Sequence, residues 1–192
     1  MARQKERRAA TRDAILNAAE KLFRRKGFEE TAVEEITAAA NVAKGTFYQH
    51  FESKPEVLMA LIRRHNAATA EAVEARLQSG APPLELGRAL IRGMADAFER
   101  DRKMAVSAVT AAMANPAKKG EPSLRTALAL VFAEAQKRRM VRQDSDPYDL
   151  ALMLMGAVLP QIIVWATEPA KKGVLSARLD RAWRTLLEGF QA

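Results

Sequence analysis

Hydrophobic residues recur three or four positions apart along nearly the whole chain, and no stretch alternates apolar and polar residues as a β-strand would. The first predicted helix covers residues 11–26, and Gly27 is placed to end it. Its buried stripe is expected to consist of Ile15, Ala18, Ala19, Leu22 and Phe23. The pattern therefore predicts an all-α fold.

Two short helices separated by a tight turn are predicted next. The segment TAVEEITAAA, residues 31–40, has Thr31 and Glu34 at the spacing of a helix-capping box. The turn contains Asn41, and asparagine enters the left-handed backbone region at a modest cost. A third helix is expected over residues 43–50, so the two short helices form a helix-turn-helix.

The third predicted helix has a polar side that suits DNA. At 100° per residue, Phe47 and Phe51 share the buried side, whereas Gly45, Tyr48 and Gln49 point the other way. A helix of about eight residues is ~12 Å long and fits the major groove, which is also ~12 Å wide. Glutamine can pair with adenine there, and lysine and tyrosine can reach phosphates.

A resemblance to a known family rests on this region. The N-terminal DNA-binding domain of TetR-type transcriptional regulators is similar to residues 11–58, TRDAILNAAEKLFRRKGFEETAVEEITAAANVAKGTFYQHFESKPEVL, and the densest match is KGTFYQHFESK. The resemblance implies that these residues lie at or near DNA: Thr31, Lys44, Gly45, Thr46, Tyr48, Gln49, His50 and Lys54. For His50 a packing role fits as well as a phosphate contact. Lys54, at the start of the next helix, is expected to bind a phosphate.

Further helices are predicted in the rest of the chain, separated by proline and glycine. A long helix starts at residue 55 and ends near residue 78, and others are expected over residues 84–101, 104–114, 122–141, 147–166 and 174–190. We therefore predict a helix-turn-helix DNA-binding domain with a basic N-terminal arm, residues 1–54, and an effector-binding and dimerisation domain, residues 55–192.

The second domain has two candidate interaction surfaces. A pocket for a largely apolar small-molecule effector is expected to be lined by Met94, Phe98, Thr110, Met113, Met153, Gln161 and Trp165, although methionines also fill ordinary cores. The helix predicted at 147–166 is apolar on nearly every face, and a chain of this size cannot easily cover it. A two-fold homodimer interface is therefore expected, formed by Leu154, Val158, Leu179, Trp183, Leu186 and Phe190.

Charge favours a polyanionic partner. The 192 residues include 31 Lys and Arg against 23 Asp and Glu, a net charge of +8. Within residues 1–12 the basic side chains Arg3, Lys5, Arg7, Arg8 and Arg12 accompany a single acid, Glu6. This arm is either a phosphate-binding segment or a solvated tail.

The remaining composition argues against catalysis and secretion. The chain has no cysteine, and its two histidines lie on different predicted helices without a metalloenzyme motif or a glycine-rich phosphate loop. No metal site, cofactor or catalytic residue is therefore expected. The N-terminus leads into no apolar signal segment, and the apolar run at 150–166 is interrupted and shorter than a membrane span, which predicts a cytoplasmic protein without a membrane partner.

Together these features predict a homodimeric transcriptional regulator. It would act as a repressor that leaves a near-palindromic operator in double-stranded DNA when a small molecule binds. Two alternatives from other classes are an architectural DNA-binding protein without an effector and an enzyme built in a helical bundle. Binding without sequence preference would favour the architectural protein, whereas protection of a palindrome would favour the regulator.

Overall fold

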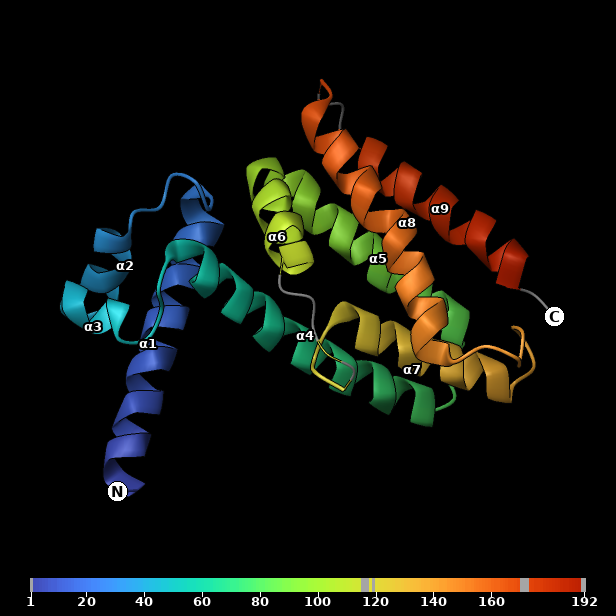
Figure 1. Ribbon diagram of the computed structural model, residues 1–192, viewed down its shortest axis with the longest axis horizontal. Coiled ribbons are helices and arrows are strands. Elements are labelled where there is room, and N and C mark those ends of the chain that lie inside the picture. Colours follow the sequence, from blue (N-terminus) through green and yellow to red (C-terminus); the bar gives the residue numbers. More distant parts are fainter. Residues whose placement is uncertain (1, 115–117, 119, 170–172, 191–192) are drawn as a thin grey trace. The chain divides into compact units, whose positions relative to one another are not determined.

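Helices form all the regular secondary structure in the described part of the chain (Figure 1). The structure is a computed structural model, and it describes residues 2–114, 118, 120–169 and 173–190. The helices are α1 (Ala2–Lys26), α2 (Val33–Ala40), α3 (Lys44–Tyr48), α4 (Lys54–Gln78), α5 (Pro83–Arg100), α6 (Arg102–Ala114), α7 (Leu124–Lys137), α8 (Pro147–Thr167) and α9 (Val174–Phe190). The all-α prediction is confirmed for these residues.

The chain divides into two compact units, Met1–Ile62 and Arg63–Ala192. The predicted boundary after residue 54 falls at the start of α4, whereas the division lies inside this helix. The first turns of α4 belong to the N-terminal unit, where Val57 and Leu58 are buried. One continuous helix therefore contributes to both units.

The N-terminal unit packs α1, α2 and α3 around apolar side chains from all three helices, and the periodicity predicted the burial of Ile15 and Phe47. Ile15, Ile36 and Phe47, one from each helix, are fully buried. Asn41 ends α2 in the left-handed conformation, with φ 54° and ψ 47°, so the predicted turn is confirmed. The start of α1 differs from the prediction, because the helix begins at Ala2 and the basic arm is its N-terminal extension.

The C-terminal unit has its core between α5, α7, α8 and α9. Ile91 of α5, Phe132 of α7, Leu154 of α8 and Trp183 of α9 belong to one cluster of buried side chains. Figure 1 shows α8 and α9 running alongside each other in this unit. A smaller apolar cluster joins the last turns of α4 to α5 and α7, through Val73, Leu77, Leu86, Ala127 and Val131.

Candidate nucleic-acid interface and effector cavity

The start of α2 is one residue later than the capping box predicted. The helix begins at Val33, and the Glu35 carboxylate accepts a hydrogen bond from the backbone N–H of Ala32 at 2.9 Å. The Thr31 hydroxyl instead donates to the carbonyl oxygen of Gly27 at 2.7 Å, and the residue is 1% exposed. The prediction that Thr31 lies at DNA therefore needs correction, because its side chain is inside the N-terminal unit.

The exposed side of α3 is where the sequence placed it. Lys44, Gly45 and Tyr48 are exposed, as is Gln49, which directly follows the helix. A Cβ atom on Gly45 would meet no other heavy atom within 4 Å, so packing against the described residues does not require glycine there. The helix is only five residues long rather than eight, because Gln49 and His50 form a turn after it. Thr46 is half-buried at its edge.

Lys44 is paired across the helix-turn-helix. Its Nζ atom lies 2.6 Å from the Glu34 carboxylate of α2, and this hydrogen bond raises the pKa of Lys44 and lowers the pKa of Glu34. Both side chains are more than half exposed, and such pairs contribute little to stability in water. A phosphate can therefore replace the carboxylate as the partner of Lys44 at a small cost.

Lys54 has a different environment from the predicted phosphate site. Its Nζ atom donates to the carbonyl oxygens of Phe28 and Glu29, at 2.7 and 3.0 Å, and lies 4.5 Å from the centroid of the Phe28 ring. The ammonium thus holds the loop between α1 and α2 against the start of α4. Two of its three protons are used within the chain.

His50 lies between the end of α3 and the face of α1 that carries arginines. It is half-buried, and burial is the main reason that its pKa is lowered, with the positive charges of Arg8 and Arg12 adding to the effect. The neutral imidazole is therefore favoured near pH 7. This environment fits both roles that the sequence left open for His50.

The residues predicted for the effector pocket do not come together. Thr110, Met113, Met153 and Gln161 are exposed, and Met94 and Phe98 pack against the core of the C-terminal unit. Trp165 is 4% exposed, and its indole N–H has no acceptor among the described residues. The prediction of one pocket lined by these seven residues is corrected accordingly, since methionines filled surface and core positions instead.

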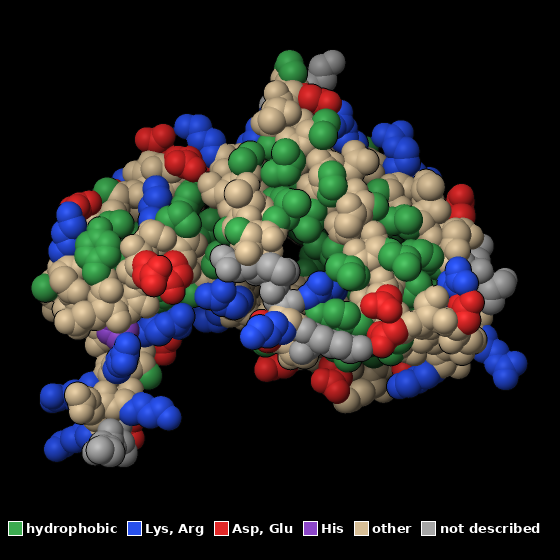
Figure 2. All heavy atoms as spheres, in the orientation of Figure 1, with side chains coloured by type: hydrophobic (Ala, Val, Ile, Leu, Met, Phe, Trp, Pro, Cys, Tyr) green, Lys and Arg blue, Asp and Glu red, His purple; other side chains and the backbone are tan. Residues whose placement is uncertain are grey.

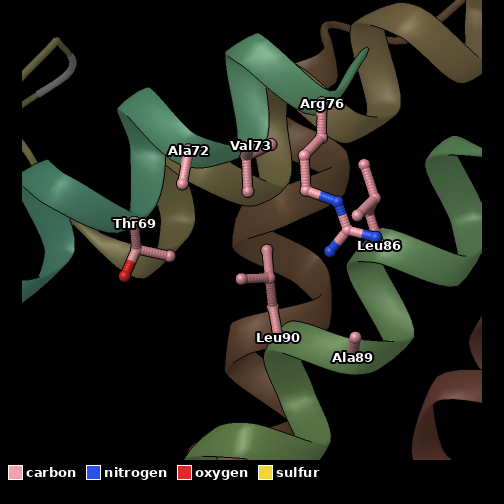
Figure 3. Close-up of a pocket in the computed structure, with 7 residues that line it drawn as sticks. All are labelled: Thr69, Ala72, Val73, Arg76, Leu86, Ala89 and Leu90. Atoms are coloured by element: carbon pink, nitrogen blue, oxygen red, sulfur yellow. The ribbon is translucent and has the colours of Figure 1, made fainter. Parts of the chain in front are cut away.

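The structure has an open cavity between α4 and α5 of about 220 Å³ (Figure 3). The lining residues are Thr69, Ala72, Val73 and Arg76 of α4, with Leu86, Ala89 and Leu90 of α5. In Figure 3 the Arg76 side chain extends from α4 toward α5, and its guanidinium lies beside Leu86. It has no ionic or hydrogen-bonding partner within the described part of the chain. Small residues such as Ala72 and Ala89 leave no pattern that the sequence alone could have revealed.

The side chains predicted for a dimer interface lie mostly inside one chain. Leu154, Val158, Leu179, Trp183 and Phe190 are at most 7% exposed and belong to the core, and only Leu186 is half-buried beside it. This part of the prediction is corrected, because a partner cannot reach buried side chains.

A different side of α8 is exposed and apolar. Leu152, Met153 and Val164 are 47%, 56% and 48% exposed, with Gly156 and Pro160 between them. By length and composition α8 is the one helix of the described chain that passes as a membrane span, and only 33% of its most apolar window is buried. Its other side packs in the core through Leu150, Ala151, Leu154, Val158, Ile162 and Trp165. Figure 2 shows hydrophobic side chains over this helix.

The fold and the exposed side of α3 define a helix-turn-helix protein with a second, larger helical unit. A family model described as bacterial regulatory proteins of the tetR family matches residues 15–61. The HTH-type transcriptional repressor BepR of Brucella suis is 41% identical over 64 residues, 33% of this chain. That match spans 31% of BepR, and the match to the regulator TcmR of Streptomyces glaucescens spans 33% of that protein.

Two other relatives match most of the chain. The HTH-type transcriptional repressor KstR of Mycolicibacterium smegmatis is 29% identical over 96% of this chain and 88% of its own length. The crystal structure of Thermus thermophilus FadR, a TetR-family repressor in complex with lauroyl-CoA, is 29% identical, covers 94% of this chain and 95% of FadR, and has a TM-score of 0.71. The chain is thus similar to TetR-family regulators, through the family model over residues 15–61 and through KstR and FadR over nearly its whole length.

Proposed function

We propose that the protein is a cytoplasmic transcriptional repressor that binds a near-palindromic operator as a homodimer and is released by a small-molecule effector. The observation that carries this proposal is the exposed side of α3, where Lys44, Tyr48 and Gln49 surround a glycine with open space above it. Such a surface brings the backbone close to DNA while polar side chains reach phosphates and base edges. The similarity to the repressors KstR and FadR supports repression rather than activation of transcription.

The effector is proposed to bind in the cavity between α4 and α5. Its walls are apolar except for Thr69 and Arg76, so they suit a molecule with an apolar body. The unpaired Arg76 guanidinium adds a preference for a carboxylate, phosphate or carbonyl group at one end. The complex of FadR with lauroyl-CoA, a ligand with an apolar chain and anionic groups, supports this class of effector.

The homodimer is proposed to form through the exposed side of α8. Leu152 and Met153 are adjacent, and Val164 follows Met153 by eleven positions. At 100° per residue the three side chains therefore fall within about 120° of the helix circumference, on one side of the helix. An apolar strip of this kind is costly in water and is covered when two copies pair about a two-fold axis. Two helix-turn-helix units then read two half-sites about one helical turn apart.

Selection of bound fragments from genomic DNA tests this function directly. We expect recovery of a near-palindrome, whereas recovery without sequence preference would favour the architectural protein. Gly45→Leu should then weaken operator binding about tenfold or more, because the new side chain occupies the space that DNA requires. The matched control is Gly93→Leu on α5, where open space also surrounds the glycine and no DNA contact is expected.

Gly45→Leu should not reduce thermal stability, because leucine favours a helix and its Cβ atom would have open space around it. Equal operator binding by the two leucine variants would contradict the proposed role of α3.

A further inference from the structure

The first turns of α1 carry basic side chains that no described residue neutralises. Arg3, Lys5, Arg7 and Arg8 are exposed, and none of these side chains has an ion pair or hydrogen bond within the described residues. Glu6 is the one acid among them. Figure 2 shows Lys and Arg side chains surrounding this end of the helix.

The chain itself does little to stabilise a helix in this segment. The first turn contains no acidic residue, so no carboxylate there offsets the positive end of the helix dipole, and Arg3 and Lys5 add to its positive charge. Arg3 and Arg7 are one turn apart, where like charges repel. The first buried side chain of α1 is Ile15, so no apolar packing holds the preceding turns. A polyanion would remove the repulsion and favour the helical form.

One row of these charges lies on the face of α1 that meets the end of the helix-turn-helix. Lys5, Arg8 and Arg12 are spaced by three and four residues and therefore share a face. The Arg12 guanidinium carbon lies 4.8 Å from the centroid of the Phe51 ring, and the charges of Arg8 and Arg12 act on His50. The row thus starts beside the segment that follows α3 and extends along α1. Arg3 and Arg7 lie on the opposite face.

The length of the row matches a DNA strand. The seven helical steps from Lys5 to Arg12 rise about 10 Å, a length that contains about three phosphates of one strand when measured along the duplex axis. We propose that residues 2–12 of α1 form a second DNA-binding element, in which Lys5, Arg8 and Arg12 bind backbone phosphates that flank the base pairs read by α3. DNA binding also stabilises the helix of this segment. The inference rests on the proposed function, because it requires that α3 faces DNA.

The salt dependence of operator binding tests the proposal with a matched pair of variants. Lys5→Gln/Arg8→Gln and Arg3→Gln/Arg7→Gln remove the same charge from the same helix but from opposite faces. The first variant should lower the slope of log affinity against log salt by about 1.8, which is about 0.9 for each lost phosphate contact. Its affinity should therefore fall about 12-fold less than that of the wild type between 50 and 200 mM salt. The second variant should keep most of the wild-type slope.

Equal slopes for both variants would contradict the proposal that DNA contacts only the face of Lys5 and Arg8. A wild-type slope for the first variant would show that this face makes no phosphate contact. Amide hydrogen exchange of residues 3–10 should slow when operator DNA is added to the full-length protein. Unchanged exchange would overturn the stabilisation of the helix. Tight binding of the arm to anionic phospholipid vesicles, with no effect of either variant on DNA binding, would assign the row to a membrane surface instead.

Failure of this inference differs from failure of the proposed function. If the wild-type protein selects a palindrome while the arm variants bind like the wild type, only the second DNA-binding element is excluded. If the wild-type protein selects no sequence, the function proposed for α3 fails.

Discussion

Alanine at Gly87 would intrude on the most crowded contact of the C-terminal unit. Gly87 is buried on α5, and a Cβ atom there would lie 2.3 Å from Cη2 of Trp183 and 3.1 Å from Cζ2 and Cζ3. Carbon atoms at ideal contact are about 3.5–4.0 Å apart, so the indole would have to move. Trp183 is 2% exposed, and its ring stacks on Phe132 with the centroids 6.1 Å apart. Both features restrict a movement of the indole.

The size of the effect follows from two opposing contributions. Alanine in place of glycine stabilises a helix by about 0.5–1 kcal/mol. Overpacking a core costs about 1–3 kcal/mol, so Gly87→Ala should lower the free energy of unfolding by up to about 2.5 kcal/mol. Gly93→Ala in the same helix has open space and should raise it by about 0.5–1 kcal/mol. Because the helix contribution is common to both variants, their difference of about 1–3 kcal/mol measures the steric effect alone.

Tryptophan fluorescence during urea unfolding is the suitable assay. The two tryptophans, Trp165 and Trp183, are both in the C-terminal unit, so the signal reports on that unit. All proteins must be compared at one concentration, because dimerisation would make the midpoint depend on it. Equal midpoints for Gly87→Ala and Gly93→Ala would refute the contact. A Gly87→Ala variant that is monomeric but equally stable would instead indicate that Trp183 lies in the dimer interface, as the sequence predicted.

Three further predictions concern the N-terminal unit and the dimer. Lys54→Met should destabilise the protein by about 1 kcal/mol, because two hydrogen bonds to loop carbonyls are lost. Urea unfolding followed by circular dichroism measures this change. Unchanged stability, together with a salt slope of DNA binding that is lowered by about 1, would show a phosphate contact instead. The folded-state pKa of His50 lies below its ordinary value of 6.5, so protonation favours the unfolded chain and stability should fall as the pH drops through 6.5, levelling off below the folded-state pKa. His50→Gln should reduce this fall, and matching pH profiles would contradict it. Val164→Glu should give monomers in sedimentation, whereas Val106→Glu, at an exposed position of α6, should leave the dimer intact. A dimeric Val164→Glu variant would show that this side of α8 is not the dimer interface.

Local features of the fold could be predicted because they depend on neighbours in sequence. The period of apolar residues gave the helices, and asparagine at position 41 gave the left-handed turn. The outward side of α3 followed from helical geometry, since Phe47 had to be buried. Helix ends were less predictable, because Thr31 bonds to the Gly27 carbonyl and leaves the capping role to Glu35.

Features that depend on distant segments could not be predicted. The periodicity of α9 identified an apolar stripe, but only the positions of Gly87 and Phe132 show that Trp183 faces its own core. Because α8 is apolar all round, its pattern cannot distinguish the buried side from the exposed side. The ammonium of Lys54 binds carbonyls 25 and 26 residues earlier, which no local rule reveals.

Helix α4 gives the proposed effector a physical route to the operator. Its first residue, Lys54, is bonded to the loop that precedes α2, and its later turns line the cavity with Thr69 and Arg76. A ligand shifts the protein toward a state only if it binds that state more tightly. An effector that requires a wider separation of α4 and α5 therefore selects a conformation in which α4 is displaced. Because this helix is continuous from Lys54 to Gln78, such a displacement would involve the turns of α4 that belong to the N-terminal unit. In the proposed dimer it would thereby change the spacing of the two helix-turn-helix units.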